Sequence, residues 1–397
     1  MRKPKLVESR SIVASLLVGV ASSLPVVAAD INVPAEYATI QAAVDAAASG
    51  DTIHIAAGVY TEQIVIVRKN LTLFGAPGAV IMAQPGLSST LLQNFETSEN
   101  SLLAIALSDV LVSGLTFEGE QLADSETYGS LVGIYYLGAS GRVINCKVEG
   151  FHGTTFNDGR GIGILAGNPV SLGAPVVKVE VFDSGFADNQ TSMVVSGDDD
   201  LNPSLLRTSF IIEGNTITGP GLGSDALFLA GIVIGTGAGG EVRQNTIRDH
   251  IFIGPNIYYA AFAITAFDQR GFGASLAPVP LQAVRYEGNT FLNNQVHLAA
   301  ILANGSQFVN NTFQGTGPGP VPIGVGVTGD EILIANNDFS DMPRGIQLVG
   351  GGPEHGTFLG ITTNAKVIAN RFCGVDEPIV IDPLVTGVKE HATKICP

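Results

Sequence analysis

Three consecutive aspartates are the most concentrated chemical feature of this 397-residue sequence. Asp198, Asp199 and Asp200 directly follow an apolar, strand-like run that ends at Gly197. Adjacent carboxylates repel one another unless solvent or a cation screens them, and their hard oxygen atoms suit Ca²⁺. We therefore predict a calcium site at the three aspartates and no organic cofactor; the alternative is a solvated acidic turn. A cation held there would link the protein to an acidic sugar and polarise the bond next to its carboxylate.

Asp198, Asp268 and Arg270 are candidate catalytic residues. Asp268 and Arg270 follow another apolar, strand-like run. If the strands that begin near residues 192, 231 and 262 stack in order, Asp198 and Asp268 lie two coils apart. Two strand spacings amount to roughly 9.6 Å, which is the span of one or two sugar rings. The alternative for Asp268 with Arg270 is a surface ion pair, which contributes little.

Four further side chains are candidates for contact with a sugar. His250 lies in a predicted turn and is a candidate general base, with an ordinary turn residue as the alternative. Arg160 offers a planar fork that suits a sugar carboxylate. Tyr135 and Tyr258 are candidates for stacking on sugar rings, although neighbouring residues of a strand point to opposite sides and each belongs to a Tyr-Tyr pair.

The composition excludes several classes of protein. The chain has 20 Lys and Arg against 36 Asp and Glu, which gives a net charge of −16. Nucleic-acid binding is not expected, because it needs a basic footprint that neutralises phosphates. Apolar residues make up 45% and charged residues 14%, which excludes a disordered chain. The 49 glycines do not follow a three-residue period, which excludes collagen.

The N-terminal segment 1–29 has the pattern of an export signal. Four basic side chains near the start precede a mostly apolar stretch at 11–27, and Val27-Ala28-Ala29 forms a small-residue cleavage site. We predict a mature chain that starts at Asp30, carries a net charge of 16 minus 35, or −19, and has no membrane span. An uncleaved anchor is the alternative. The protein is then periplasmic, extracellular or on the cell surface, and we expect a monomer.

The residues after this signal predict one helix followed by many short strands. Tyr37, Ile40, Val44 and Ala47 recur at helical spacing, and Gly50 ends the pattern, which predicts a helix over 35–48. Short alternating runs separated by Gly and Asn follow this segment. A helix in this place would cap the open end of a stack of strands, whose backbone groups would otherwise stay unpaired.

An irregular repeat then continues almost to the end of the chain. Its unit is an apolar strand, an Asn, one variable residue, and Phe or Ile, with degenerate copies at 113–117 and 143–148. The unit is constant while the loops between copies vary in length, and the clear copies have their Asn at positions 215, 245, 289, 311, 337 and 370. Repeats of this kind stack into a solenoid that buries the inward residues of each coil. We predict an all-β solenoid over 30–375 with at least eight coils, in which the Asn side chains stack along one turn.

The beginning of this region resembles a known family. Segments at Tyr37–Ala43, Gly50–Ile53, Gly58–Tyr60 and Leu71–Gly75 are similar to the entry of bacterial pectinesterase-like proteins, and the Asn-x-Phe repeats extend the likeness to about Cys373. The chain thus resembles the right-handed parallel β-helix proteins of the pectin-lyase-like superfamily. The resemblance implies a carbohydrate ligand. The superfamily includes lyases, hydrolases, esterases, epimerases and adhesins, so the fold does not choose among these functions.

The catalytic motifs of the two best-known enzymes of this superfamily are absent. A pectinesterase needs two aspartates, an oxyanion-stabilising glutamine and an arginine in fixed runs, and none of these runs is present; the chain also has no Trp. A polygalacturonase needs four motifs, of which only the run Asp198–Asp200 resembles a part. No catalytic role is therefore carried over from either enzyme.

Two functions remain open at the level of sequence. The first is an exported polysaccharide-active enzyme, most concretely a lyase or hydrolase of an acidic polysaccharide, supported by the resemblance, the signal segment and the acidic turns. The second is a non-catalytic β-helix that binds glycans or serves at the cell surface. The missing motifs, the absence of Trp and the few charges on the outer faces support the second function.

The cysteines predict one disulfide bond. Export would place them in an oxidising compartment, where unpaired thiols are uncommon. Cys373 follows the last repeat, and Cys396 lies next to the terminus, in a segment at 376–397 where two prolines are expected to end regular structure. We predict that this tail folds back over the last coil and pairs Cys396 with Cys373. The alternative is that all three cysteines are free thiols.

Overall fold

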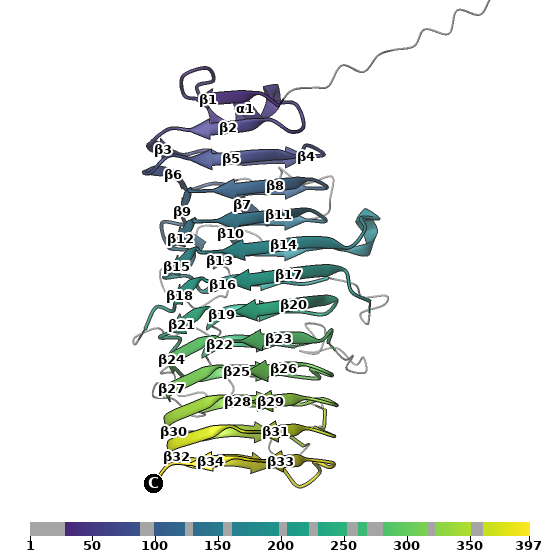
Figure 1. Ribbon diagram of the computed structural model, residues 1–397. Coiled ribbons are helices and arrows are strands. Elements are labelled where there is room, and N and C mark those ends of the chain that lie inside the picture. Colours follow the sequence, from purple (N-terminus) through teal and green to yellow (C-terminus); the bar gives the residue numbers. More distant parts are fainter. Residues whose placement is uncertain are drawn as a thin grey trace, which may run out of the picture.

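The computed structural model shows a long parallel β-helix (Figure 1). It describes residues 28–87, 99–123, 130–153, 161–197, 205–221, 229–251, 261–267, 281–316, 322–350 and 360–397. Between the first and last coils, each coil contributes strand residues to each of three faces, and all pairings between the named strands are parallel. This confirms the predicted fold class, and the number of stacked strands exceeds the predicted minimum of eight coils.

Face 1 is a 13-stranded sheet that runs the length of the solenoid. Its strands are β1 (Asp30–Val33), β2 (Thr52–Ile55), β5 (Leu71–Gly75), β8 (Asp109–Ser113), β11 (Ser140–Ile144), β14 (Val177–Phe182), β17 (Thr208–Glu213), β20 (Ala238–Arg243), β23 (Val284–Glu287), β26 (Gln307–Val309), β29 (Leu333–Ala335), β31 (Lys366–Ile368) and β33 (Lys389–His391).

Faces 2 and 3 together form a 21-stranded sheet. Face 2 contains β3 (Gly58–Tyr60), β6 (Ala79–Met82), β9 (Thr116–Glu118), β12 (Lys147–Glu149), β15 (Gly185–Ala187), β18 (Thr216–Thr218), β21 (Thr246–Arg248), β24 (Thr290–Asn294), β27 (Thr312–Thr316) and β34 (Lys394–Ile395). Face 3 contains β4 (Ile64–Val67), β7 (Asn100–Ala106), β10 (Leu131–Leu137), β13 (Gly161–Gly167), β16 (Thr191–Val195), β19 (Leu229–Ile234), β22 (Ala261–Ala266), β25 (Val296–Ala300) and β28 (Ile323–Val327). The long strands β30 (Asp338–Leu348) and β32 (Arg371–Ile381) span both faces. A short 3-10 turn at Val170–Leu172 precedes β14.

One helix, α1 (Ile40–Ala46), packs at the first coil. It is shorter than the predicted 35–48, because Thr39 caps its start by accepting a hydrogen bond from the Ala42 amide at 3.1 Å. Residues before Thr39 form turns instead of helix. Ile40, Ala43 and Val44 are buried on the side that packs against β1, β2 and β4. The helix therefore covers the first coil, as its amphipathic pattern predicts.

The core is a set of inward-facing columns that run along the solenoid axis. Phenylalanines at the inward position of face 2 stack ring on ring: Phe291 on Phe313 at 4.8 Å, Phe313 on Phe339 at 4.7 Å, and Phe339 on Phe372 at 4.9 Å between ring centroids. Each of these rings is at most 1% exposed. Such stacks add a geometric preference to the burial of apolar surface, which fixes the register of successive coils.

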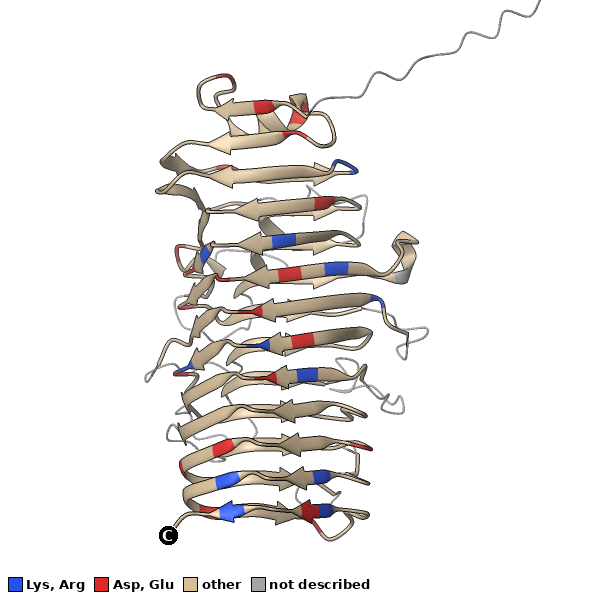
Figure 2. Cartoon of the chain, in the orientation of Figure 1, with Lys and Arg blue, Asp and Glu red and all other residues tan. Residues whose placement is uncertain are grey.

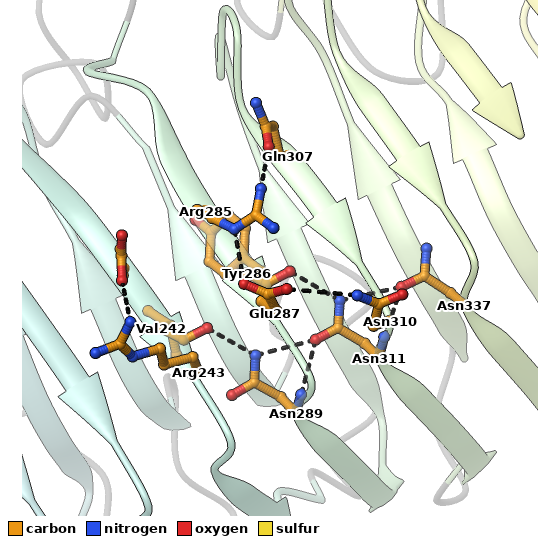
Figure 3. Close-up of polar contacts among 11 residues, drawn as sticks. Val242, Arg243, Arg285, Tyr286, Glu287, Asn289, Gln307, Asn310, Asn311 and Asn337 are labelled. Atoms are coloured by element: carbon orange, nitrogen blue, oxygen red, sulfur yellow. Dashed lines mark hydrogen bonds and ion pairs between the residues drawn. The ribbon is translucent and has the colours of Figure 1, made fainter.

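A ladder of buried asparagines links the coils at the turn between faces 1 and 2. Each side-chain amide donates to the side-chain carbonyl of the next Asn at 2.9–3.0 Å, through Asn215, Asn245, Asn289, Asn311, Asn337 and Asn370. Each of these carbonyl oxygens also accepts the backbone N–H of the preceding Asn. Part of the ladder is visible in Figure 3. The ladder confirms the predicted stacking of the Asn side chains.

The earlier coils use different residues in the ladder position. The Cys146 amide donates to the Ser184 hydroxyl at 3.1 Å, and the Ser184 amide donates to the side-chain carbonyl of Asn215 at 2.9 Å. Asn145 was the expected ladder residue of its degenerate repeat, but it has φ +53° and precedes the ladder position. The expected alignment was thus wrong by one residue, and the buried Cys146 occupies the ladder position.

The C-terminal segment forms a further coil and not an irregular tail. β32 continues to Ile381, and β33 and β34 then pair with β31 and β32. This corrects the predicted boundary at 375, since strands continue almost to the last residue. In the structure the sulfur atoms of Cys373 and Cys396 are bonded, with their Cα atoms 4.7 Å apart.

The first described strand begins next to the predicted cleavage site. β1 starts at Asp30, and the Ala29 amide donates to the Asp51 carboxylate at 2.8 Å. Residues 1–27 lie outside the described part of the chain, so signal cleavage stays a prediction. In the described ranges, no helix has the length and apolar character needed to cross a membrane.

Candidate functional site

Most of the predicted site residues lie outside the described part of the chain. These are Asp198, Asp199, Asp200, Asp268, Arg270, Arg160 and Tyr258. The strands that lead toward two of them are described: β16, β19 and β22 pair in that order, as the predicted spacing between Asp198 and Asp268 requires. The predicted calcium site and the roles of these residues stay predictions.

His250 lies in the core of the solenoid. It is 1% exposed, and its Nδ1 atom lies 3.0 Å from the Oδ1 atom of Asn294. Burial lowers the pKa of His250 to about 4, while its contacts with Asn294 and the charge of Asp249 act in the opposite direction. A buried imidazole cannot reach a polysaccharide, so the predicted role as a general base is not supported.

Tyr135 is also buried, and the outward side of face 3 is apolar around it. Tyr135 is 7% exposed and packs in a small cluster with Val132 and Leu137. The positions in register with Tyr135 on the described strands of face 3 are all uncharged: Ala104, Leu165, Val194, Val233, Thr265, Ala299, Gly326 and Gln347. A sugar ring cannot stack on a tyrosine this deeply buried, so the predicted contact is not supported.

The structure instead brings acidic residues together on face 2. Glu118 ends β9 and Glu149 ends β12, and the two residues are in register on successive coils. Their neighbours Phe117 and Val148 point into the core, so the glutamates point outward. The acidic hollow is the resulting space of about 620 Å³ lined by Glu118, Glu120, Gln121, Glu149, Gly150 and Asp188.

A side-chain hydrogen bond to Glu149 is one of the contacts that raise the pKa of Glu118. The pKa of Glu118 is raised to about 7, first by burial of its carboxyl group and then by the nearby charges of Glu149 and Glu120. The backbone amide of Glu120, 3.4 Å from Oε1 of Glu118, acts in the opposite direction. Lys147 forms an ion pair with Glu149. A pKa of about 7 lets Glu118 carry a proton near neutral pH, next to the Glu149 carboxyl group.

The local backbone makes room for this pair. Gly150 has φ +73°, and a Cβ atom at this position would lie 2.3 Å from Oε1 of Glu118. A side chain at this position would require the Glu118 carboxyl to move. Glu120 and Gln121 both have positive φ, at +52° and +57°. Left-handed backbone at non-glycine residues carries strain, which is frequent at functional sites.

A histidine supports the opposite wall of the hollow. The Nε2 atom of His152 lies 3.2 Å from Oδ2 of Asp188, and its Nδ1 atom faces the carbonyl of Gly153. The hydrogen bond from His152 lowers the pKa of Asp188. His152 is 3% exposed, so it acts as a fixed support for Asp188 and not as a surface group.

The hollow is suited to proton transfer more than to holding a metal by itself. Within the described ranges, no three His, Cys, Asp or Glu side chains form a group arranged to hold a metal ion. A carboxylic acid beside a carboxylate can donate one proton and accept another in the same reaction. Each carboxylate on the wall can also supply one ligand to a cation, and a bound substrate would supply further ligands.

The sequence contains a signal for this site that the prediction from the repeats missed. A glutamate directly follows each of the degenerate repeats at 113–117 and 143–148. Continuing both repeats by one position places Glu118 and Glu149 at the same place in successive coils. Figure 2 shows acidic and basic residues at this corner of the solenoid and also on face 1.

Comparisons with known proteins support the fold. No protein-family model and no curated protein matches the sequence. Among solved structures, a mannuronic acid specific polysaccharide family 6 lyase from human gut microbiota has a TM-score of 0.53 and 13% identity, over 88% of this chain and 86% of the lyase. The PL6 family alginate lyase AlyGC has a TM-score of 0.58 and 16% identity over 93% of this chain, which spans about half (52%) of that enzyme. XylC, solved with xylose, has a TM-score of 0.50 and 13% identity over 87% of this chain and 67% of XylC. At these identities the likeness establishes the parallel β-helix fold, and this chain is similar in architecture to polysaccharide lyases.

Proposed function

We propose that this protein processes polysaccharide at the acidic hollow, most concretely as a lyase of an acidic polysaccharide. The observation that carries the proposal is that Glu118 and Glu149 lie in register on successive coils and line the same acidic hollow. Burial, which raises the pKa of Glu118 to about 7, supports it. The likeness in fold to two polysaccharide lyases makes carbohydrate the first ligand class to test.

The geometry of the pair favours elimination over ordinary hydrolysis. Glycoside hydrolases separate their two carboxyl groups by about 5–5.5 Å or by about 6.5–9.5 Å, to leave room for the sugar or for water. Glu118 and Glu149 are in direct hydrogen-bond contact. In an elimination, the Glu149 carboxylate would take the proton from the carbon next to the uronate carboxyl group. The electron pair left behind forms a double bond, the glycosidic C–O bond breaks, and the departing oxygen takes the proton of Glu118.

The charge of the hollow sets a further requirement. A uronate chain is an anion, and it would meet Glu120 and Asp188 as well as the catalytic pair. We propose that a divalent cation, Ca²⁺ first, links the substrate carboxylate to these side chains and withdraws charge from it. The run Asp198–Asp200 remains a second proposed calcium site. We also propose that the protein is exported and acts as a monomer on polysaccharide or on a cell-surface glycan.

One observation favours a second candidate, a non-catalytic glycan-binding or cell-surface structural protein. The outward side of the described face 3 strands is apolar around Tyr135 and offers no ionisable side chain in that register. Under this alternative, Glu118 and Glu149 would only join two coils. Turnover separates the two candidates, because a structural protein has none.

The test is a panel of alginate, polygalacturonate, xylan and cellulose, each incubated with the purified protein with and without millimolar Ca²⁺. The proposal expects ultraviolet-absorbing unsaturated uronate ends from one of the two acidic polymers, and more of them with Ca²⁺. New reducing ends without unsaturated product would identify a hydrolase and contradict the elimination. Absence of any product, together with retained binding to one polymer, would favour the structural alternative.

A further inference from the structure

A second hollow, on face 1 and away from the acidic hollow, carries an inference that goes beyond the proposed function. Glu241 of β20, Arg285 of β23 and Gln307 of β26 are in register and form one outward row across three successive coils. They line a hollow of about 330 Å³. Small ligands occupy pockets of about 300–1,000 Å³, so this hollow has room for a single sugar ring.

The floor of the hollow consists of small residues. Gly240, Ala283 and Gly305 line it between the polar side chains. At Gly240 a Cβ atom would lie 2.0 Å from the carbonyl oxygen of Phe210, so no larger residue fits there without movement of the backbone.

The polar side chains around the floor are already held in place. The Nε atom of Arg285 donates to Glu287 at 2.8 Å, and its Nη1 atom donates to the side-chain carbonyl of Gln307 (Figure 3). Arg243 donates to the Oε2 atom of Glu241 at 2.8 Å. Because these side chains are fixed before a ligand arrives, binding does not have to order them.

Donors and acceptors remain available beside one another. Among the described residues, Nη2 of Arg285 and the side-chain NH₂ of Gln307 have no hydrogen-bond acceptor, and Oε1 of Glu241 has no donor. The same row continues to Ile211 on one side and Leu333 on the other, so aliphatic side chains flank the polar groups. Two donors next to one acceptor match adjacent hydroxyl groups, each of which accepts and donates.

The charge balance decides between a neutral and an anionic ligand. Arg243 pairs with Glu213 and Glu241, while Arg285 pairs with Glu287. Two cations thus face three carboxylates, which leaves the cluster with a net negative charge. An incoming carboxylate or phosphate would be repelled, whereas a hydroxyl pair would not. We propose that this hollow binds a neutral sugar unit through two adjacent hydroxyl groups, as a glycan-binding site separate from the acidic hollow.

The test measures binding and not turnover, so its result is independent of the proposed lyase activity. Calorimetric titrations with xylotriose, cellotriose and mannotriose, and with trigalacturonate as the acidic probe, are carried out on Glu118→Gln protein. At least one neutral trisaccharide should bind at one site and shift the NMR signal of the Gln307 side-chain amide. Arg285→Met, which keeps the stem and removes the donors, should weaken this binding at least tenfold. Ala283→Tyr should do the same by filling the hollow while leaving the polar contacts intact.

The matched control lies in the same row of face 1. Arg142 and Glu180 occupy the corresponding positions on β11 and β14, outside the hollow. Arg142→Met should leave the affinity within twofold of the parent. The proposal is overturned if no neutral trisaccharide shifts the Gln307 signal, if trigalacturonate binds this hollow more tightly, or if folded Ala283→Tyr protein binds as the parent does.

Discussion

Glu118 and Glu149 lie in register on successive coils, and their carboxyl groups share a hydrogen bond. Parallel stacking brings identical positions of neighbouring coils to one strand spacing, about 4.8 Å. Two acidic residues at the same position of adjacent repeats must therefore share a proton, bind a cation or repel each other. This arrangement is what makes the side of the solenoid a candidate for chemistry.

Replacing Gly150 with alanine should disrupt the carboxyl pair. The new Cβ atom would lie 2.3 Å from Oε1 of Glu118, in addition to the strain of φ +73°. Gly288→Ala is the control, because Gly288 has φ +64° and its nearest neighbour is an atom of the Gln244 side chain at 3.8 Å. Left-handed strain alone costs roughly 1–2 kcal/mol, and both variants should show it. NMR titration of the glutamate carboxyls should show the pKa of Glu118 falling from about 7 in Gly150→Ala protein only. An unchanged pKa would mean that the pair does not depend on this glycine.

Two buried histidines should make the protein sensitive to acid. Burial lowers the pKa of His250 to about 4 and that of His297 to about 3. Both are neutral in the folded state, so the stability that they contribute is present above the unfolded pKa of 6.5 and is lost as the pH falls below it. Each should add a slope of about 1.4 kcal/mol per pH unit below that point. Glu118 acts in the opposite direction, since its raised pKa weakens the folded state as the pH rises toward 7.

Urea unfolding between pH 7 and pH 4.5 tests this sensitivity. His297→Gln protein should show a flatter dependence of the unfolding free energy on pH than the wild type. His54→Gln is the control, since His54 is partly exposed and contacts Asp30 at the surface. If the unfolding free energies of His297→Gln and wild-type protein depend on pH in the same way, His297 is not the neutral buried group described above.

Loss of the buried ladder residue Asn311 should destabilise the solenoid more than loss of Asn310, the exposed asparagine that precedes it in the sequence. Asn311 is 1% exposed and links Asn289 to Asn337, and its amide also donates to the Tyr286 carbonyl at 3.0 Å. Asn311→Ala leaves several buried partners unsatisfied and should cost about 2–4 kcal/mol. Asn310→Gly is the control, because Asn310 is exposed and glycine tolerates its φ of +57°. Equal midpoints of chemical unfolding for the two variants would show that the ladder contributes little to stability.

Cys396→Ser should loosen the last coil. The two cysteines of the Cys373–Cys396 bond have a sequence separation of 23, and closing such a loop corresponds to about 3 kcal/mol in the chain-entropy model. Hydrogen exchange should accelerate in β33 and β34 and remain unchanged in β1 and β2 at the other end. Peptide mapping of unreduced protein supplies the direct check, since both residues must resist alkylation. Alkylation of both in native protein would refute the pairing.

The sequence predicts the repeat architecture well because the repeat itself has a physical cause. Each Asn between a strand and a buried Phe marks a turn where amide stacking and ring stacking both occur, so the spacing of Asn215 to Asn370 reports the coils directly. The alignment failed at Asn145 because Cys146 and Ser184 replace asparagine there. The last coil was missed because Pro378 lies within β32, where its missing N–H is tolerated.

The candidate site was harder to predict, because it depends on which side chains neighbouring coils bring together. Asp198–Asp200 form a run that is visible in the sequence. Glu118 and Glu149 are 31 residues apart and become neighbours only because β9 and β12 pair in register. His250 was misjudged because turn residues of a β-helix can point inward, and its imidazole bonds to Asn294 of the next coil. Sequence spacing shows where coils begin and end, but it does not show which turn residues enter the core.

The most direct test of the account compares Glu118→Gln with Glu390→Gln on the acidic polymer that the wild type degrades. Glutamine keeps the size of Glu118 but cannot carry the transferable proton, whereas Glu390 is exposed on β33, away from the hollow. The account predicts that Glu118→Gln forms unsaturated uronate ends at least 100-fold more slowly, that its folded structure is kept, and that Glu390→Gln matches the wild type. Equal rates for Glu118→Gln and the wild type would contradict the assignment of the acidic hollow as the active site.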